Sequence, residues 1–198
     1  MSFRPVGNAV NLAQDLGMVS SRRDVVNLAQ DFSLGTGMRL QSQSRNAGRL
    51  KMSHTYTSTL THCVFSTKGR KPLIHDDLRP ALWAYMGGIA RKNKMKALAV
   101  GGTSDHVHLL LLIPADLSLA KALQLIKGGS SKWAHEKVPD FAWQEGYGAF
   151  SVGLSQVPAT IAYINNQERH HRKVTFMQEF IAFLKKHNLE YDERYVFG

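Results

Sequence analysis

The chain has 198 residues, of which 43% are hydrophobic, so it can form one domain with a core but not two large domains. Its formal net charge of +10 favours a polyanionic partner, either nucleic acid or an anionic membrane surface. No apolar run approaches the ~18 residues of a membrane span and the first residues lack the apolar centre of a signal peptide, so we expect a soluble, cytoplasmic protein with nucleic acid as its leading partner.

Residues 1–51 differ from the rest in composition, because they are rich in Ser, Asn, Gln, Gly and Arg and show little sustained periodicity. We interpret them as a flexible basic extension before a domain at 52–198. Met52 is a plausible alternative start, so the extension is either a functional arm or the product of a start codon assigned too early.

The domain reads as alternating strands and helices with turn residues between them. The predicted elements are a strand at 55–66, a helix at 76–94, strands at 97–103 and 106–113, a helix at 118–133, a strand at 141–152, and helices at 155–171 and from 175 onward. Gly128 and Gly129 are expected to bend the second helix or to bring its backbone close to a ligand. The single Cys63 lies in an apolar strand and is expected to be structural.

The order βαββαβ followed by helices predicts an α+β fold of the ferredoxin-like, split-βαβ type. In this fold an antiparallel sheet carries helices on one face. A helix after the last strand, near the C-terminus, then carries Tyr163.

Asp105-His106-Val107-His108 opens the most apolar predicted strand. Because side chains alternate along a strand, both imidazoles share one face while Val107 points to the other. Two such nitrogens can hold a divalent metal. The alternative is that these histidines are solvated or hydrogen-bonded at the end of a strand.

Tyr163 and Gln167 are four residues apart on a predicted helix and so project from one face. If that face lies against His106 and His108, two imidazoles and an amide oxygen can hold a metal beside a phenol. A metal bound to a phosphate oxygen makes the phosphorus electrophilic, and Tyr163 can attack it as the phenolate. The alternative is that Tyr163 only packs the helix against the sheet.

Five segments together resemble one known family. They are THCVFSTK at 61–68, GGTSDHVHLL at 101–110, LIKGGSSKW at 125–133, YINNQERHHR at 163–172 and LEYDERY at 189–195. In these segments the chain resembles the single-tyrosine HUH transposases of bacterial insertion sequences, which cut and rejoin single-stranded DNA. HUH denotes histidine, bulky hydrophobe, histidine, here His106 to His108. Residues 1–51 take no part in the resemblance.

The resemblance implies that Tyr163 is the nucleophile, forming a 5′-phosphotyrosine link and releasing a 3′-hydroxyl. It implies His106, His108 and Gln167 as ligands of Mg²⁺ or Mn²⁺. It also implies single-stranded DNA hairpins as substrate and a homodimer, in which the tyrosine acts on the HUH pair of its own or of the other subunit.

Basic residues near the predicted active edge are candidate DNA contacts, although charged runs also mark solvated faces. These residues are Lys68, Arg70, Lys71, Lys127, Lys132, Arg169, Arg172 and Lys173. Trp133, Trp143 and Tyr147 can stack on bases or pack in the core. His170 and His171 lie beyond the Tyr163 and Gln167 face and are interpreted as DNA-proximal or structural.

Two other functions stay open. One is a domesticated relative of the same fold that cuts chromosomal repeat hairpins. The other is a non-catalytic RNA-recognition-type module, which would need exposed aromatics on two central strands but no HUH strand.

Overall fold

The computed structural model describes residues 56–192, and the predicted extension at 1–51 lies outside them. Strands β1 (Leu60–Ser66), β2 (Lys96–Gly102), β3 (His106–Leu112) and β4 (Gly148–Ser151) form one antiparallel sheet in the order β2-β3-β1-β4. This is the ferredoxin-like order that the sequence predicts.

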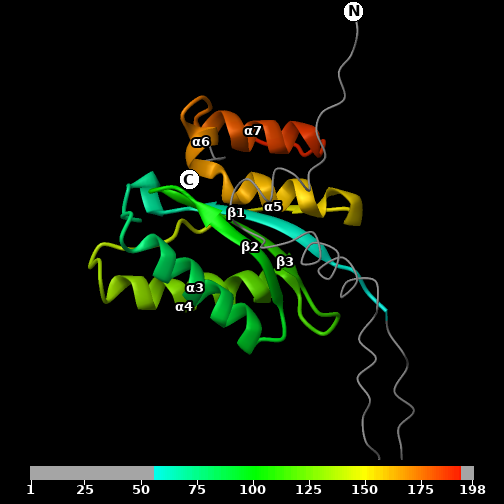
Figure 1. Cartoon of the computed structure of the whole chain (residues 1–198), viewed down its shortest axis with the longest axis horizontal. Helices are drawn as coiled ribbons and strands as arrows, with labels where there is room; N and C mark the ends of the chain where they lie inside the picture. The colour runs from blue at the N-terminus through cyan, green and yellow to red at the C-terminus, as the bar shows by residue number, and fades with distance from the viewer. Residues whose placement is uncertain (1–55, 193–198) are drawn as a thin grey trace, which may run out of the picture. The chain divides into compact units, whose positions relative to one another are not determined.

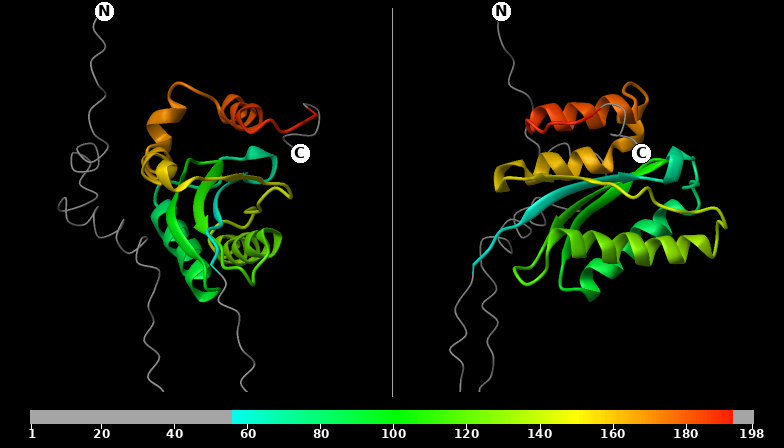
Figure 2. Two further views of the ribbon diagram at one scale, coloured as in Figure 1. Left: turned by 90° about the vertical axis from the view of Figure 1, so that its right-hand side faces the viewer. Right: turned by 180° about the vertical axis from the view of Figure 1, so that it is seen from behind.

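Helices cover both faces of this sheet (Figures 1 and 2). On one face lie α3 (Arg79–Lys92) and α4 (Leu119–His135), the two crossover helices that we expected there. The opposite face carries α5 (Val157–Asn165), α6 (Gln167–His171) and α7 (Phe176–Lys186). Two short 3₁₀ turns, η1 (Lys68–Arg70) and η2 (Leu154–Gln156), complete the described elements.

The larger apolar cluster fills the space between the sheet and α3 and α4. Alternate residues of the central strands point into it, among them Cys63, Phe65, Val107, Leu109 and Leu111. Cys63 is fully buried, and burial raises the pKa of its thiol to about 12. The expectation of a structural thiol is therefore confirmed.

A smaller apolar cluster lies on the other face, between the sheet and α7. It consists of Val64, Phe150, Phe176, Phe180 and Leu184. Because both faces are covered, the side chains on either side of β1 and β3 are shielded from water.

Some local predictions were wrong. The helix α4 runs unbroken through Gly128 and Gly129. A Cβ atom at Gly129 would lie 2.8 Å from Cδ1 of Ile89, so this glycine lets α3 and α4 approach each other rather than bending α4. The predicted strand at 141–152 shortens to β4, because Trp143 makes only an isolated bridge to Thr67.

The predicted helix at 155–171 is also divided. It ends at Asn165 and restarts at Gln167, because Asn166 takes the non-helical dihedral angles φ −109° and ψ 23°. Within residues 56–192, no helix has the length and apolar character needed to cross a bilayer.

Candidate metal and nucleophile site

The two HUH histidines lie at the beginning of β3, an inner strand of the sheet, on the face covered by α5 and α7. They pair with β1 at Ser66 and Val64, whereas Val107 between them points into the larger cluster. His106 is 1% exposed and His108 is 0% exposed, so neither is a solvated residue at a sheet edge.

Each HUH ring is fixed through its Nδ1 atom. The His106 Nδ1 atom lies 2.7 Å from Oδ1 of Asp105 and 2.9 Å from Oγ1 of Thr103. The His108 Nδ1 atom lies 3.0 Å from Nε2 of His62 on β1. Partners of this kind set the ring orientation of metal-binding histidines, and they leave both Nε2 atoms free to face a common point.

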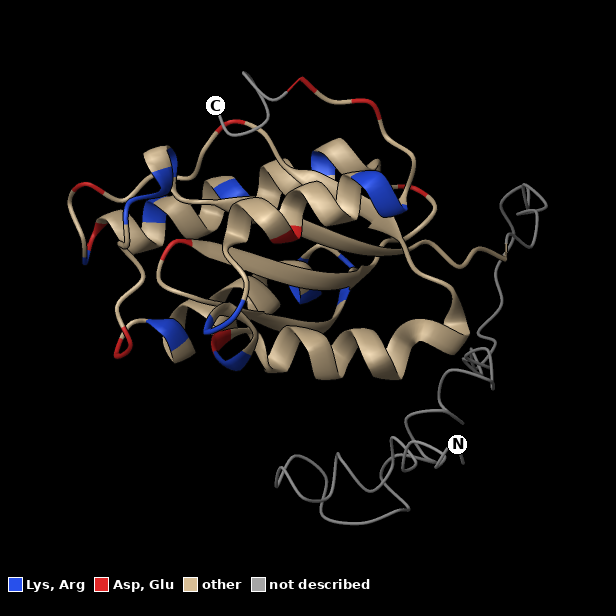
Figure 3. Ribbon diagram, turned by 90° about the horizontal axis from the view of Figure 1, so that it is seen from above, with Lys and Arg blue, Asp and Glu red and all other residues tan. Residues whose placement is uncertain are grey.

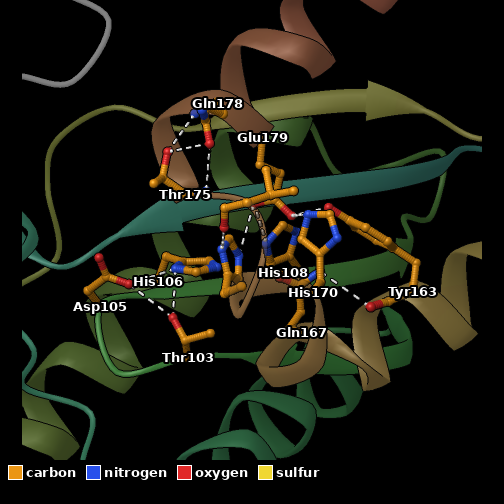
Figure 4. A network of polar contacts seen from close by, with 12 residues as sticks. Thr103, Asp105, His106, His108, Tyr163, Gln167, His170, Thr175, Gln178 and Glu179 are labelled. Atoms are coloured by element: carbon orange, nitrogen blue, oxygen red, sulfur yellow. Dashed lines mark hydrogen bonds and ion pairs between the residues drawn. The ribbon is translucent and has the colours of Figure 1, made fainter.

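Two further donors reach the same point from α6 and α7. The Oε2 atom of Glu179 lies 3.4 Å from the Nε2 atoms of both His108 and His171. Together with His106, these donor atoms all lie within 4.8 Å of one another. Figure 4 shows the Glu179 side chain descending from α7 toward the imidazoles.

In this cluster the donor atoms that face one another are buried but not hydrogen-bonded. In the described part of the chain this holds for Nε2 of His106, His108 and His171 and for Oε2 of Glu179. Buried polar atoms without partners are rare in folded proteins, and where they do occur together they often face a bound ion. Three imidazole nitrogens and a carboxylate oxygen suit a borderline divalent ion, so these residues fit Mn²⁺, one of the two ions that the resemblance implies, better than Mg²⁺.

The position of Glu179 follows from how α7 begins and packs. Thr175 caps the helix by accepting from the backbone N–H of Gln178, while the Gln178 side chain accepts from the N–H of Thr175. The apolar stripe through Phe176 and Phe180 then faces the sheet. Glu179 lies within that stripe, so it is carried into the interior.

Sequence reasoning missed Glu179 and left His171 outside the metal site. One signal was available: a carboxylate interrupts the apolar period of α7, with Phe176, Phe180 and Phe183 around it. For His171 no such signal exists, because its direction depends on the break at Asn166.

Burial and mutual contacts set the charges in the cluster. Burial lowers the pKa of His108 to about 4, although the Glu179 carboxylate opposes this, so the ring is neutral at pH 7 and can bind a metal. Burial alone would raise the pKa of Glu179, but contacts with His108, His171 and Tyr163 outweigh it and lower that pKa. Glu179 is therefore a carboxylate.

Tyr163 lies beside its own HUH pair within one chain. Its helix α5 packs against β2 and β3, and its ring centroid is 5.8 Å from that of His108. The Tyr163 hydroxyl donates a hydrogen bond to Oε1 of Glu179. Burial and the Glu179 charge raise the pKa of Tyr163 above its ordinary value.

Gln167 lies one residue beyond the break at Asn166 and is 1% exposed. Its Nε2 atom donates to the backbone oxygen of Tyr163 at 3.3 Å. Its Oε1 atom is buried with no hydrogen bond from the described residues, so this oxygen is available as a ligand.

Two hollows adjoin Tyr163. One, of about 520 Å³, lies between α5, β4 and α7 and is lined by aromatic rings, including Phe150 and Phe183. The other, of about 210 Å³, is lined by Asn166, Arg169, His170 and Lys173 besides Tyr163.

Lysines and arginines are spread over several separate elements (Figure 3). Those predicted to contact DNA lie on or next to η1, α4 and α6. Six of them are exposed: Lys68, Lys71, Lys132, Arg169, Arg172 and Lys173. Arg70 pairs with Asp105 at 3.3 Å. Lys127 differs, because its ammonium group donates to the backbone oxygens of residues 144, 145 and 146 at 2.7, 2.8 and 2.9 Å, which occupies all three of its N–H donors.

The three aromatics considered for base stacking also differ in exposure. Trp143 is 7% exposed and donates from Nε1 to Oγ of Ser130 at 3.0 Å, so it belongs to the core. Trp133 stacks on Tyr85, with ring centroids 5.1 Å apart. Tyr147 is 39% exposed.

Comparisons with known proteins find similar chains among transposases. Curated transposases for insertion sequence element IS200 from Salmonella typhimurium and Salmonella typhi are each 26% identical over 110 residues, covering 52% of this chain and 72% of the relative. Two solved structures are similar, each with a TM-score of 0.48. One is a Deinococcus radiodurans chain assigned as a transposase, with 23% identity over 62% of this chain and 98% of that one. The other is a REP-associated tyrosine transposase bound to a REP hairpin, with 14% identity over 72% of this chain and 86% of that one.

The sequence profile described as "Transposase IS200 like" matches residues 55–167, more than half of the chain, including His106, His108, Tyr163 and Gln167. The profile thus spans the whole sheet and the tyrosine helix α5. The chain therefore belongs to the IS200-like transposase family, whose members are mobile-element enzymes of DNA recombination.

Proposed function

We propose that this transposase cuts and rejoins single-stranded DNA at hairpin-marked element ends through a 5′-phosphotyrosine link on Tyr163, in a metal-dependent reaction. One observation carries the proposal: within a single chain the Tyr163 hydroxyl donates to one oxygen of Glu179, and the other oxygen lies 3.4 Å from Nε2 of the HUH residue His108. A packing aromatic needs no such contact with a cluster of buried donor atoms.

In the proposed reaction the Tyr163 oxygen attacks the phosphorus of a phosphodiester. The bond between Tyr163 and phosphorus forms, the bond from phosphorus to the 3′-oxygen breaks, the phenol loses its proton and the 3′-oxygen gains one. The hydrogen bond to Glu179 orients the phenol and gives its proton an acceptor. The link conserves the phosphodiester energy, so a 3′-hydroxyl of another strand can reverse the step.

His106, His108 and Gln167 are the proposed ligands of Mg²⁺ or Mn²⁺, with Asp105 and His62 holding the two imidazoles in place. When bound, such a cation would polarise a phosphate oxygen and favour ionisation of the phenol. That help is needed, because burial and Glu179 raise the pKa of Tyr163.

The basic hollow beside the nucleophile supports a DNA substrate. Arg169 and Lys173 line it together with Tyr163, which suits the phosphates that flank a scissile bond. The other proposed phosphate contacts are Lys68, Arg70, Lys71, Lys132 and Arg172, and Lys127 is left out because its donors are used internally. A homodimer and a cytoplasmic location belong to the same proposal.

The buried sheet argues against an RNA-recognition-type module. Such a module binds bases on aromatic residues that are exposed on its two central strands. Here β1 and β3 are almost entirely buried, and their outer face lies under α5 and α7.

The test uses a single-stranded oligonucleotide that contains a hairpin and carries a label on the 5′ side or the 3′ side of the cleavage point. The full chain should form a covalent adduct with the strand on the 3′ side, and Tyr163→Phe should form none. His106→Ala and addition of EDTA should also abolish the adduct. An adduct formed by Tyr163→Phe at the rate of the unmodified chain would refute the assigned nucleophile.

A further inference from the structure

We propose that His171 and Glu179 are metal ligands in this transposase, so that a His₃-carboxylate site formed by β3, α6 and α7 holds a transition-metal ion in preference to Mg²⁺. The inference deepens the metal dependence proposed above and concerns which residues and which ion are used. His106 and His108 belong to both ligand sets, whereas His171 and Glu179 replace the Gln167 of the set proposed above, so the two sets are alternatives for one site.

The spacing of the donor atoms is the first argument. The Glu179 Oε2 atom is 3.4 Å from the Nε2 atoms of His108 and His171. Four donors placed tetrahedrally at about 2.0–2.2 Å from a divalent ion are themselves about 3.4 Å apart. A hydrogen bond between the same atoms would be near 2.9 Å, so these two spacings fit shared coordination better than direct pairing, and all four donor atoms lie within 4.8 Å of one another.

The second argument is that each donor is held in place by its other polar atom. Asp105 holds Nδ1 of His106, and His62 holds Nδ1 of His108. The Nδ1 atom of His171 lies 2.8 Å from the backbone oxygen of Val174. All three rings therefore present Nε2 inward, and those three atoms are buried with no hydrogen bond from the described residues.

In Glu179, as in the histidines, one polar atom is held by a hydrogen bond and the other has none. Its Oε1 atom accepts from the Tyr163 hydroxyl, while its Oε2 atom faces the imidazoles without a hydrogen bond. Glu179 is 4% exposed, and a buried carboxylate oxygen without a hydrogen bond destabilises the fold unless it faces a cation. Glu179 therefore joins the nucleophile to the ion, and α7 supplies part of the site.

The donor set also indicates the class of ion. Mg²⁺ prefers oxygen ligands in octahedral geometry, whereas imidazole nitrogens with one carboxylate suit Zn²⁺, Co²⁺ or Mn²⁺. The expected order of affinity is Zn²⁺ above Co²⁺, Co²⁺ above Mn²⁺, and Mg²⁺ weakest.

The experiment measures binding of the metal alone to the full chain by calorimetry, without DNA. Zn²⁺, Co²⁺, Mn²⁺ and Mg²⁺ are compared, followed by the variants Glu179→Gln and His171→Asn. Each variant should lose at least about tenfold in Zn²⁺ affinity, because even partners outside the coordination shell cost about 10–100-fold. The exposed pair His135→Asn and Glu136→Gln, at the end of α4, should leave the affinity unchanged.

Gln167→Met separates the two ligand sets. If Gln167→Met loses affinity while Glu179→Gln and His171→Asn keep it, the proposal is overturned in favour of the predicted set. The Co²⁺ complex of the unmodified chain is an independent measurement should a variant fail to fold. Four-coordinate Co²⁺ absorbs visible light strongly and six-coordinate Co²⁺ weakly, so a weak spectrum would also overturn the proposal. Since no DNA is present, neither result depends on whether the chain cleaves hairpins.

Discussion

Gly101 controls how closely the tyrosine helix approaches the HUH strand. It lies on β2 opposite His108 of β3, and a Cβ atom added to it would lie only 2.3 Å from the backbone oxygen of Ile164, the residue after Tyr163. Ordinary contact begins at 3.4 Å, so Gly101→Ala must move α5 away from the sheet by roughly 1 Å. The atom that it meets belongs to the backbone and cannot rotate away.

This displacement acts directly on the distance between Tyr163, the proposed nucleophile, and the proposed metal site. A misplacement of about 1 Å costs on the order of 100-fold in rate, so Gly101→Ala should form the covalent adduct about 100-fold more slowly. Its free energy of unfolding should fall by about 1–3 kcal/mol, as for other overpacked interiors. The assay is single-turnover adduct formation with a hairpin oligonucleotide, with urea unfolding measured in parallel.

Gly88→Ala is the matched control for Gly101→Ala. Gly88 is exposed on α3, and a Cβ atom there would have nothing within 4 Å. This change should raise stability by about 0.5–1 kcal/mol and leave the rate unaltered. If Gly101→Ala formed the adduct as fast as Gly88→Ala, the argument that backbone contact sets the position of Tyr163 would be refuted.

Two further predictions concern charge. Lys173→Gln should reduce the slope of log affinity for single-stranded DNA against log salt by about 0.7, because Lys173 is a proposed phosphate contact. Lys127→Gln should leave that slope unchanged and lower stability, because Lys127 binds backbone oxygens. Equal slopes for the two variants would contradict these two roles. Unfolding in EDTA should show stability falling as the pH drops from about 6.5 to about 4, because unfolded His62 and His108 take up protons while their folded pKa values are about 3 and about 4. His171 has a raised pKa and acts in the opposite direction. In His62→Gln the free energy of unfolding should fall less steeply as the pH drops. An unchanged steepness would contradict the lowered pKa of His62 in the folded protein.

The sequence predicts those features that depend on local periodicity. The strand order and the shared face of His106 and His108 follow from alternation with a period of two, and Tyr163 was correctly placed on a helix beyond the last strand. The profile match independently confirms the family that the motifs suggest.

Features that depend on distant partners were not predictable in this way. Glu179 is far from His106 along the chain, and only the docking of α7 brings them together. The Gly128-Gly129 pair is compatible with a bent helix and with a helix packed closely against a neighbour. The sequence does not show that Gly129 lies against the Ile89 side chain, which is why close packing was not predicted. His62 lay within a recognised motif, but its contact with His108 depends on the register of β1 and β3.

The sheet divides the interior into two apolar compartments of unequal size, and the smaller one includes the inner face of α7. Side chains in separate compartments share no partner, so substitutions in them should change stability additively. Amide hydrogens of α7 should accordingly exchange with solvent through a low-energy partial opening, while those of β1 and β3 exchange only through global unfolding. Thermodynamic independence of this kind lets the active-site side of the protein diverge in evolution while the compartment beneath α3 and α4 stays intact.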